Sequence, residues 1–178
     1  MSRRMKPTVF YASLTISYAV LLIIASLDLS ADGNPYLVVF VSTVSRIFPM
    51  IGNLSAKYPN PQTARLMFSV AWLLAIALGV ILFRLDDESW RARTKLRWSG
   101  LSKDKRLTRG LLLFLTLLFF LYYATAFPTD GHSHAVRLML SNAFFLALLG
   151  GTCVFAVPIF IKSFSLALVE INRTGQIS

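Results

Sequence analysis

The hydrophobic residues of this chain fall into four long blocks separated by polar segments. The blocks cover about residues 8–27, 66–83, 110–127 and 138–161, and they contain no Asp, Glu, Lys, Arg or His. Apolar residues are nearly continuous within each block, without the repeat of a half-buried strand or helix. A helix needs about 20 such residues to cross a bilayer. The pattern therefore predicts an all-α membrane protein, in which residues 1–178 form one domain with a bundle of four transmembrane helices.

The polar segments between the blocks differ in their basic residues. The loop 84–109 holds nine of the eighteen Lys and Arg residues, and with the N-terminus and the C-terminal tail it accounts for fourteen of them. Short loops rich in Lys and Arg remain on the cytoplasmic side of a membrane. We therefore expect a cytoplasmic basic loop 84–109 and cytoplasmic N- and C-termini. The loops 28–65 and 128–137, which share the other four basic residues, are expected outside.

Composition supports a membrane protein and argues against a nucleic-acid partner. The chain is 56% hydrophobic and 15% charged, whereas about a quarter of the residues of a soluble domain are charged. The net charge of +10 lies in short loops beside apolar blocks, where membrane lipids are the expected partners. Trp90 and Trp98 alternate with arginines, a pattern that also suits stacking on nucleic acid. We favour a helix over 88–97, capped by Asp87, that lies at the headgroups with tryptophan anchors.

The outer loop 28–65 contains a second apolar segment, 35–48, which is too short to span a membrane. Asn34 followed by Pro35 is typical of a helix start, and Pro49 is typical of a helix end. The segment is therefore expected to form a helix. It lies either on the outer membrane surface or folded back onto the bundle, and the sequence leaves both placements open.

Small residues recur every four positions in the second block, at Ala71, Ala75 and Gly79. This spacing places them on one face of a helix, where a neighbouring helix can approach closely. Close backbone contact stabilises helix association in lipid, because lipid chains are as apolar as the helices themselves. We interpret this face as a helix-packing surface.

Catalytic, cofactor-binding and metal-binding groups are not expected. His132 and His134 form an H-x-H pair with Asp130 as the only nearby helper, and we interpret them as part of a solvated turn. The acidic run Asp86, Asp87 and Glu88 is a candidate Mg²⁺ site, but no second acidic cluster completes it. Cys153 lies in an apolar block without a basic neighbour to activate its thiol. A non-enzymatic binding protein is the favoured class, and a lipid-modifying enzyme built on the acidic run is a weaker alternative.

The sequence "HAVRLMLSN" (134–142) resembles the immunity proteins of the colicin A type. The residues that carry the resemblance are Arg137, Leu138, Met139 and Asn142, and "KYPNPQTARLM" (57–67) is a weaker match. The resemblance implies a bacterial inner-membrane protein with four spans, cytoplasmic termini and a long first outer loop. It also implies a partner, the channel-forming domain of a pore-forming bacteriocin, whose hydrophobic helices the immunity protein meets in the bilayer so that the pore does not open.

The same resemblance implies candidate site residues. Arg137 and Asn142 are expected to read the toxin or to support the structure, and further candidates are Ala71, Ala75, Gly79, Arg46 and the segment 35–48. Two other functions remain open at this point. The first alternative is an immunity protein against another membrane-acting toxin. The second is a non-catalytic subunit or assembly factor of a membrane complex.

Overall fold

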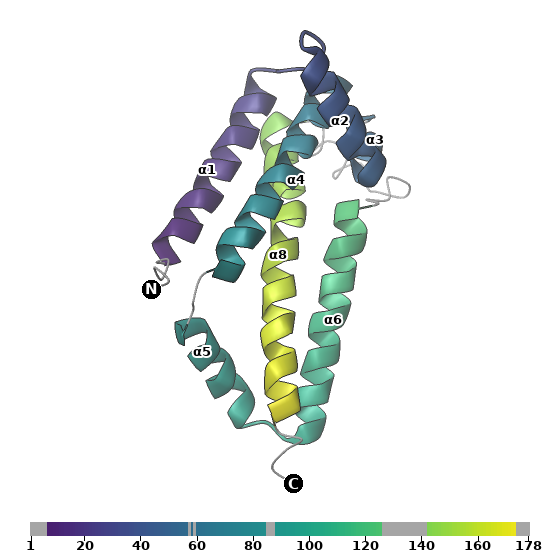
Figure 1. The fold of residues 1–178 in the computed structure, drawn as a ribbon. Helices are drawn as coiled ribbons and strands as arrows, with labels where there is room; N and C mark the ends of the chain where they lie inside the picture. The colour runs from purple at the N-terminus through teal and green to yellow at the C-terminus, as the bar shows by residue number, and fades with distance from the viewer. Residues whose placement is uncertain (1–6, 57, 59, 85–87, 126–141, 174–178) are drawn as a thin grey trace.

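Every secondary-structure element in the residues that the structure describes is an α-helix. A computed structural model describes residues 7–56, 58, 60–84, 88–125 and 142–173. Its helices are α1 (Pro7–Ser26), α2 (Pro35–Ile47), α3 (Met50–Ser55), α4 (Pro61–Arg84), α5 (Glu88–Ser99), α6 (Lys103–Thr125) and α8 (Ala143–Arg173). The start of α1 and the end of α8 point toward the end of the bundle where α5 lies (Figure 1).

Helices α1, α4 and α8 form the core of the bundle, and each of the three contacts the other two. The largest fully buried side chains come mainly from these helices, including Leu21, Phe68 and Phe155. Helix α4 contributes the most buried positions. In Figure 1 it lies between α1 and α6. The core is therefore a three-helix arrangement around α4 and α8.

Helix α6 joins this core through α8 and is shifted along it. Ring contacts pair Phe114 with Phe164 and Phe120 with Phe160, so α6 and α8 are antiparallel. In Figure 1, α6 lies beside the part of α8 nearest the C-terminus, whereas α1 and α4 lie beside the other part.

Helices α2 and α3 form a short hairpin that packs on the N-terminal half of α4 (Figure 1). The ring of Phe48, at the end of α2, stacks on Trp72 of α4 with ring centroids 3.8 Å apart. Trp72 lies about 16 Å along the helix from Pro61, at about 1.5 Å per residue. Met50 and Ile51, which follow the tip, are fully buried. The segment 35–48 is therefore folded back onto the bundle, and its tip reaches about halfway along α4.

Three of the helices are long and apolar enough to cross a membrane: Thr8–Ser26, Pro61–Arg84 and Phe144–Val169. Large apolar side chains also cover the outward faces of the bundle; examples are Ile16, Leu73, Ile76, Leu115 and Leu118. A soluble monomer rarely exposes apolar patches of this extent. The fold is that of an all-helical protein whose surface suits a lipid environment.

The predicted helices are present, but several extend beyond the apolar blocks. Helix α4 begins at Pro61 rather than near 66, and α6 begins at Lys103, inside the segment predicted as the basic loop. Helix α8 continues to Arg173, well beyond 161. The hydrophobic blocks mark apolar surroundings, whereas a helix continues for as long as its backbone hydrogen bonds can form. The boundaries at 126–141 lie outside the described residues.

The helix predicted over 88–97 is observed as α5, with one correction. Trp98 is only 6% exposed and lies inside the protein, so it is not the exposed headgroup anchor that we expected. The proposed cap, Asp87, lies outside the described residues. The predicted helix over 35–48 is confirmed as α2, and Asn34 caps it by accepting hydrogen bonds from the backbone N–H groups of Tyr36 and Leu37.

Candidate functional site

A hydrogen-bonded junction links the end of α1 to the start of α4. Asp28 has a φ of 50°, and the N–H of Leu29 donates to the carbonyl of Ile24. This geometry ends α1 as in a Schellman motif, with Asp28 in the position that glycine most often takes. The Asp28 carboxylate then accepts hydrogen bonds from the Thr63 hydroxyl at 2.6 Å and from the Asn60 amide at 2.8 Å.

The junction also determines the charge at this end of α4. The hydrogen bonds from Thr63 and, to a lesser extent, Asn60 lower the pKa of Asp28, because they stabilise its ionised form. Its negative charge lies beside the N-terminus of α4, where the helix dipole favours an anion. Burial and, secondarily, the charge of Asp28 raise the pKa of Tyr58. The ionised carboxylate of Asp28 therefore lies between the end of α1 and the start of α4.

The α2–α3 hairpin meets α4 at a seam that contains polar atoms without partners. The Nε1 atom of Trp72 and the hydroxyls of Ser45 and Ser69 are buried and have no hydrogen-bond partner in the part of the chain that the structure describes. A buried polar group without a partner costs about 1–3 kcal/mol. These three polar atoms therefore make the contact between the α2–α3 hairpin and α4 less stable than its apolar contacts alone would make it.

Helices α1 and α8 approach closely at Gly151. A Cβ atom at this position would lie 3.0 Å from the Leu21 side chain and 3.1 Å from the Tyr18 ring. The hydroxyls of Tyr18 and Thr152 share a hydrogen bond of 2.8 Å. The Thr152 hydroxyl donates its hydrogen bond to the carbonyl of Leu148, so Tyr18 is the donor in the bond between the two hydroxyls. A small residue and a polar pair thus fix this crossing, as is common between helices in lipid.

The small-residue face of α4 lies inside the bundle. Ala71 and Ala75 are buried, and a Cβ atom on Gly79 would lie 3.4 Å from the Cβ of Pro158 in α8. Helix α8 therefore occupies the side of α4 that the sequence identified as a packing face. A partner protein would have to displace α8 to reach the same surface.

Lys162 is buried, with 7% of its surface exposed. Its ammonium group donates a hydrogen bond of 2.6 Å to the backbone carbonyl of Leu82, near the end of α4. The last carbonyls of a helix have no partner within it, and a cation there also suits the helix dipole. In the sequence, Lys162 directly follows the fourth apolar block, but no local pattern there indicates that it contacts α4.

Asn142 and Arg46 lie on elements that the structure describes, whereas Arg137 lies outside the described residues. The Asn142 side chain accepts a hydrogen bond of 2.9 Å from the N–H of Phe144, so Asn142 caps α8. Arg46 is exposed in the last turn of α2. The structure does not gather the candidate site residues into one cluster: Asn142 and Arg46 lie on different elements, and the small residues of α4 are buried.

The chemical candidates give no assembled site among the described residues. In that part of the chain, no group of three or more His, Cys, Asp or Glu residues could hold a metal ion. Asp86, Asp87, Asp130, His132 and His134 lie outside it, and Glu88 begins α5. Cys153 is half-buried in α8. The arrangement of the described residues fits contact with lipid and with other helices.

Comparisons of the chain with protein-family models, with curated proteins and with solved structures give no match. Its class is therefore defined by its own features. Within its described residues the chain is an all-helical bundle, with three helices able to cross a membrane and a further long helix, α6, packed on α8. A short helical hairpin packs on one end of this bundle.

Proposed function

We propose that this protein is an immunity protein of the bacterial inner membrane. It binds the channel-forming helices of a pore-forming, colicin-like bacteriocin and prevents the pore from opening. In this proposal α1, α4, α6 and α8 are four spans, with both termini and α5 in the cytoplasm. The α2–α3 hairpin then enters the membrane from the outside and returns.

The resemblance of residues 134–142 to colicin A-type immunity proteins carries the proposal. Asn142, the last residue of that motif, caps α8, so the motif directly precedes the last helix of the bundle. Arg137 lies in the sequence between α6 and α8, and the proposed orientation places this part of the chain on the side from which a bacteriocin arrives. Fourteen of the eighteen basic residues fall in the segments assigned to the cytoplasm, which supports this orientation.

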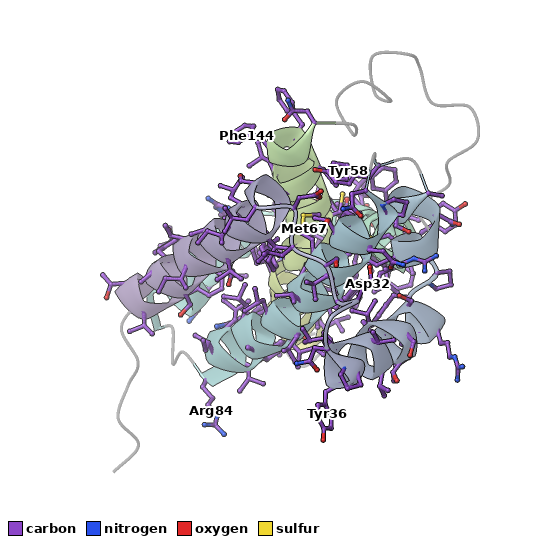
Figure 2. All side chains as sticks on the ribbon, turned by 90° about the horizontal axis from the view of Figure 1, so that it is seen from above. Asp32, Tyr36, Tyr58, Met67, Arg84 and Phe144 are labelled. Atoms are coloured by element: carbon purple, nitrogen blue, oxygen red, sulfur yellow. The ribbon has the colours of Figure 1, made fainter. Side chains whose placement is uncertain are left out.

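The surfaces of the bundle suggest where a toxin helix would bind. The small-residue face of α4 is covered by α8, so binding falls on the exposed apolar faces. Helix α2 offers such a face at the outer end: Tyr36 is 85% exposed, and Val38 and Val39 are also exposed. In Figure 2 the side chain of Tyr36 points away from the bundle, whereas Met67 lies among the helices. Arg46 lies on the same helix and adds a charge with which to discriminate among toxins.

The test is the membrane potential of sensitive bacteria that express this protein and meet the channel-forming domain encoded beside its gene. Specific immunity keeps these cells polarised, while an unrelated pore former still depolarises them. Arg137→Ala is expected to abolish protection without preventing membrane insertion, whereas Arg173→Ala at the end of α8 leaves protection intact.

Equal depolarisation with and without the inserted protein would refute the immunity function. The chain would then be tested as a subunit or assembly factor of a membrane complex, whose deletion harms cells that meet no toxin. Protection against a different membrane-acting toxin would change the partner while leaving the class of protein unchanged.

A further inference from the structure

The turn between α5 and α6 gathers exposed cations from both helices. Lys95 and Arg97 are exposed in the last turns of α5, and Lys105 and Arg109 are exposed at the start of α6. Asp104 is an exposed acidic residue in the same turn. The surface therefore carries an excess of positive charge.

Hydrogen bonds from α6 hold the turn that carries these cations. The Nε of Arg106 donates to the carbonyl of Leu101 at 2.8 Å, and an Nη atom of Arg109 lies 3.5 Å from the carbonyl of Arg97. The N–H of Leu101 in turn donates to the carbonyl of Trp98, whose side chain is buried. The cations of the turn are therefore presented by a folded corner rather than by a loose loop.

Two leucines at the corner have large exposed fractions, which is unfavourable for a surface that faces only water. Leu96 is 77% exposed between Lys95 and Arg97, and Leu107 is 53% exposed next to Arg106. Farther along α6, Leu111 and Leu112 begin the apolar surface that covers this helix. The corner thus lies where a charged surface meets an apolar one.

We propose that this corner is a binding site for anionic phospholipids. The cations Lys95, Arg97, Lys105 and Arg109 bind the lipid phosphates, and Leu96 and Leu107 contact the adjoining acyl chains. Basic groups at a membrane surface attract anionic headgroups, whereas exposed leucines favour burial in lipid. A nucleic acid would satisfy the cations but would leave both leucines in water. The proposal is independent of the immunity function.

The experiment measures lipid binding to the purified full-length protein in a neutral detergent by native mass spectrometry. Phosphatidylglycerol is compared with phosphatidylcholine of the same acyl chains. The double variant Arg97→Gln/Lys105→Gln is compared with the matched control Arg46→Gln/Arg65→Gln, which removes two cations from the other end of the bundle. Melting curves of both variants verify that they are folded.

The protein should retain phosphatidylglycerol more strongly than phosphatidylcholine. Each lost cation should weaken retention by roughly fivefold, so the double variant at the corner should lose more than tenfold, whereas the control should stay close to the unchanged protein. Leu96→Ser/Leu107→Ser should also weaken retention. Equal binding of the two lipids, or equal losses in the two double variants, would overturn the proposal. Displacement of the lipid by soluble glycerol phosphate would do so too, because the site would then bind a free phosphate.

Discussion

The ammonium group of Lys162 in α8 donates a hydrogen bond to the backbone carbonyl of Leu82 in α4. This contact joins two core helices at a point where α4 is about to end and its carbonyls lack partners within the helix. It also explains how a lysine is accommodated in an otherwise apolar part of the bundle. A buried cation is tolerated when hydrogen-bond acceptors surround it.

Replacing Lys162 by methionine is expected to destabilise the protein. Methionine fills a similar space but leaves the Leu82 carbonyl without the donated hydrogen bond, at a cost of about 1–3 kcal/mol. Unfolding of the detergent-solubilised protein by SDS titration measures this loss. Lys95→Met, at an exposed site on α5, is the control and should change stability little. Equal stability of the Lys162 variant and the unchanged protein would show that the hydrogen bond contributes nothing.

The two glycines at helix crossings predict opposite responses to alanine. At Gly151 the new methyl group would meet Leu21, which is fully buried, and Tyr18, which the Thr152 hydroxyl holds in place. Neither neighbour has room to move, so Gly151→Ala should cost about 1–3 kcal/mol.

At Gly79 the contact with Pro158 is an ordinary 3.4 Å, so Gly79→Ala should be neutral or slightly stabilising. The same SDS titration compares the two variants. Both carry the same substitution inside a helix, so the change in helix propensity cancels in their difference. A Gly151 variant as stable as the Gly79 variant would contradict the close approach of α1 and α8.

The helices themselves could be predicted from the sequence because long apolar blocks and Asn-Pro pairs have direct physical meanings. The pair Asn34-Pro35 predicted the start of α2 correctly. The pair Asn60-Pro61 carries the same signal, and it would have placed the start of α4 at Pro61 rather than near 66. Asn60 does cap this helix, because its side chain accepts hydrogen bonds from the backbone of Gln62 and Thr63.

Contacts between distant segments could not be predicted in the same way. Nothing in the local sequence of Asp28 indicates that its carboxylate reaches Thr63, or that Phe48 stacks on Trp72. Both contacts depend on how the chain returns to α4 after the hairpin. The small-residue face of α4 was predicted as a packing surface, but the sequence could not name the helix that covers it.

The Phe48–Trp72 stack is expected to hold the α2–α3 hairpin on α4. The seam contains three buried polar atoms without partners among the described residues, so it depends strongly on its aromatic contact. Phe48→Ala should release the hairpin. The Phe48 ring is half-buried, so its loss should cost less than truncating a fully buried aromatic ring, which costs about 3–5 kcal/mol. In a Cys153→Ser background, Met50→Cys reports on release through its reaction with a water-soluble maleimide.

Met50 is fully buried, so Met50→Cys should react slowly in the intact hairpin and at least tenfold faster after Phe48→Ala. Tyr36→Cys, at a site that is 85% exposed, provides the reference rate for an open position. If Met50→Cys reacts as fast as Tyr36→Cys while Phe48 is present, the hairpin is not packed on α4.

The Asp28 junction between α1 and α4 predicts that the stability of the protein depends on pH. Thr63 and Asn60 lower the pKa of Asp28 in the folded state below its value of about 3.9 in an unfolded chain. A lowered pKa contributes stability above the unfolded value, and this contribution is lost as the pH falls through the folded pKa. Thermal melting should therefore show a loss that begins near pH 4 and grows on further acidification.

Asp28→Asn is the variant that separates this effect from the backbone geometry, because asparagine also tolerates the positive φ of this position. Its amide cannot accept hydrogen bonds at both atoms, so one of the bonds from Thr63 and Asn60 is lost. The variant should melt at a lower temperature at pH 7, and the acid-induced loss that belongs to Asp28 should disappear. If Asp28→Asn loses as much melting temperature on acidification as the unchanged protein, the pH dependence belongs to other groups. The charge of Asp28 would then contribute nothing to the stability of the junction.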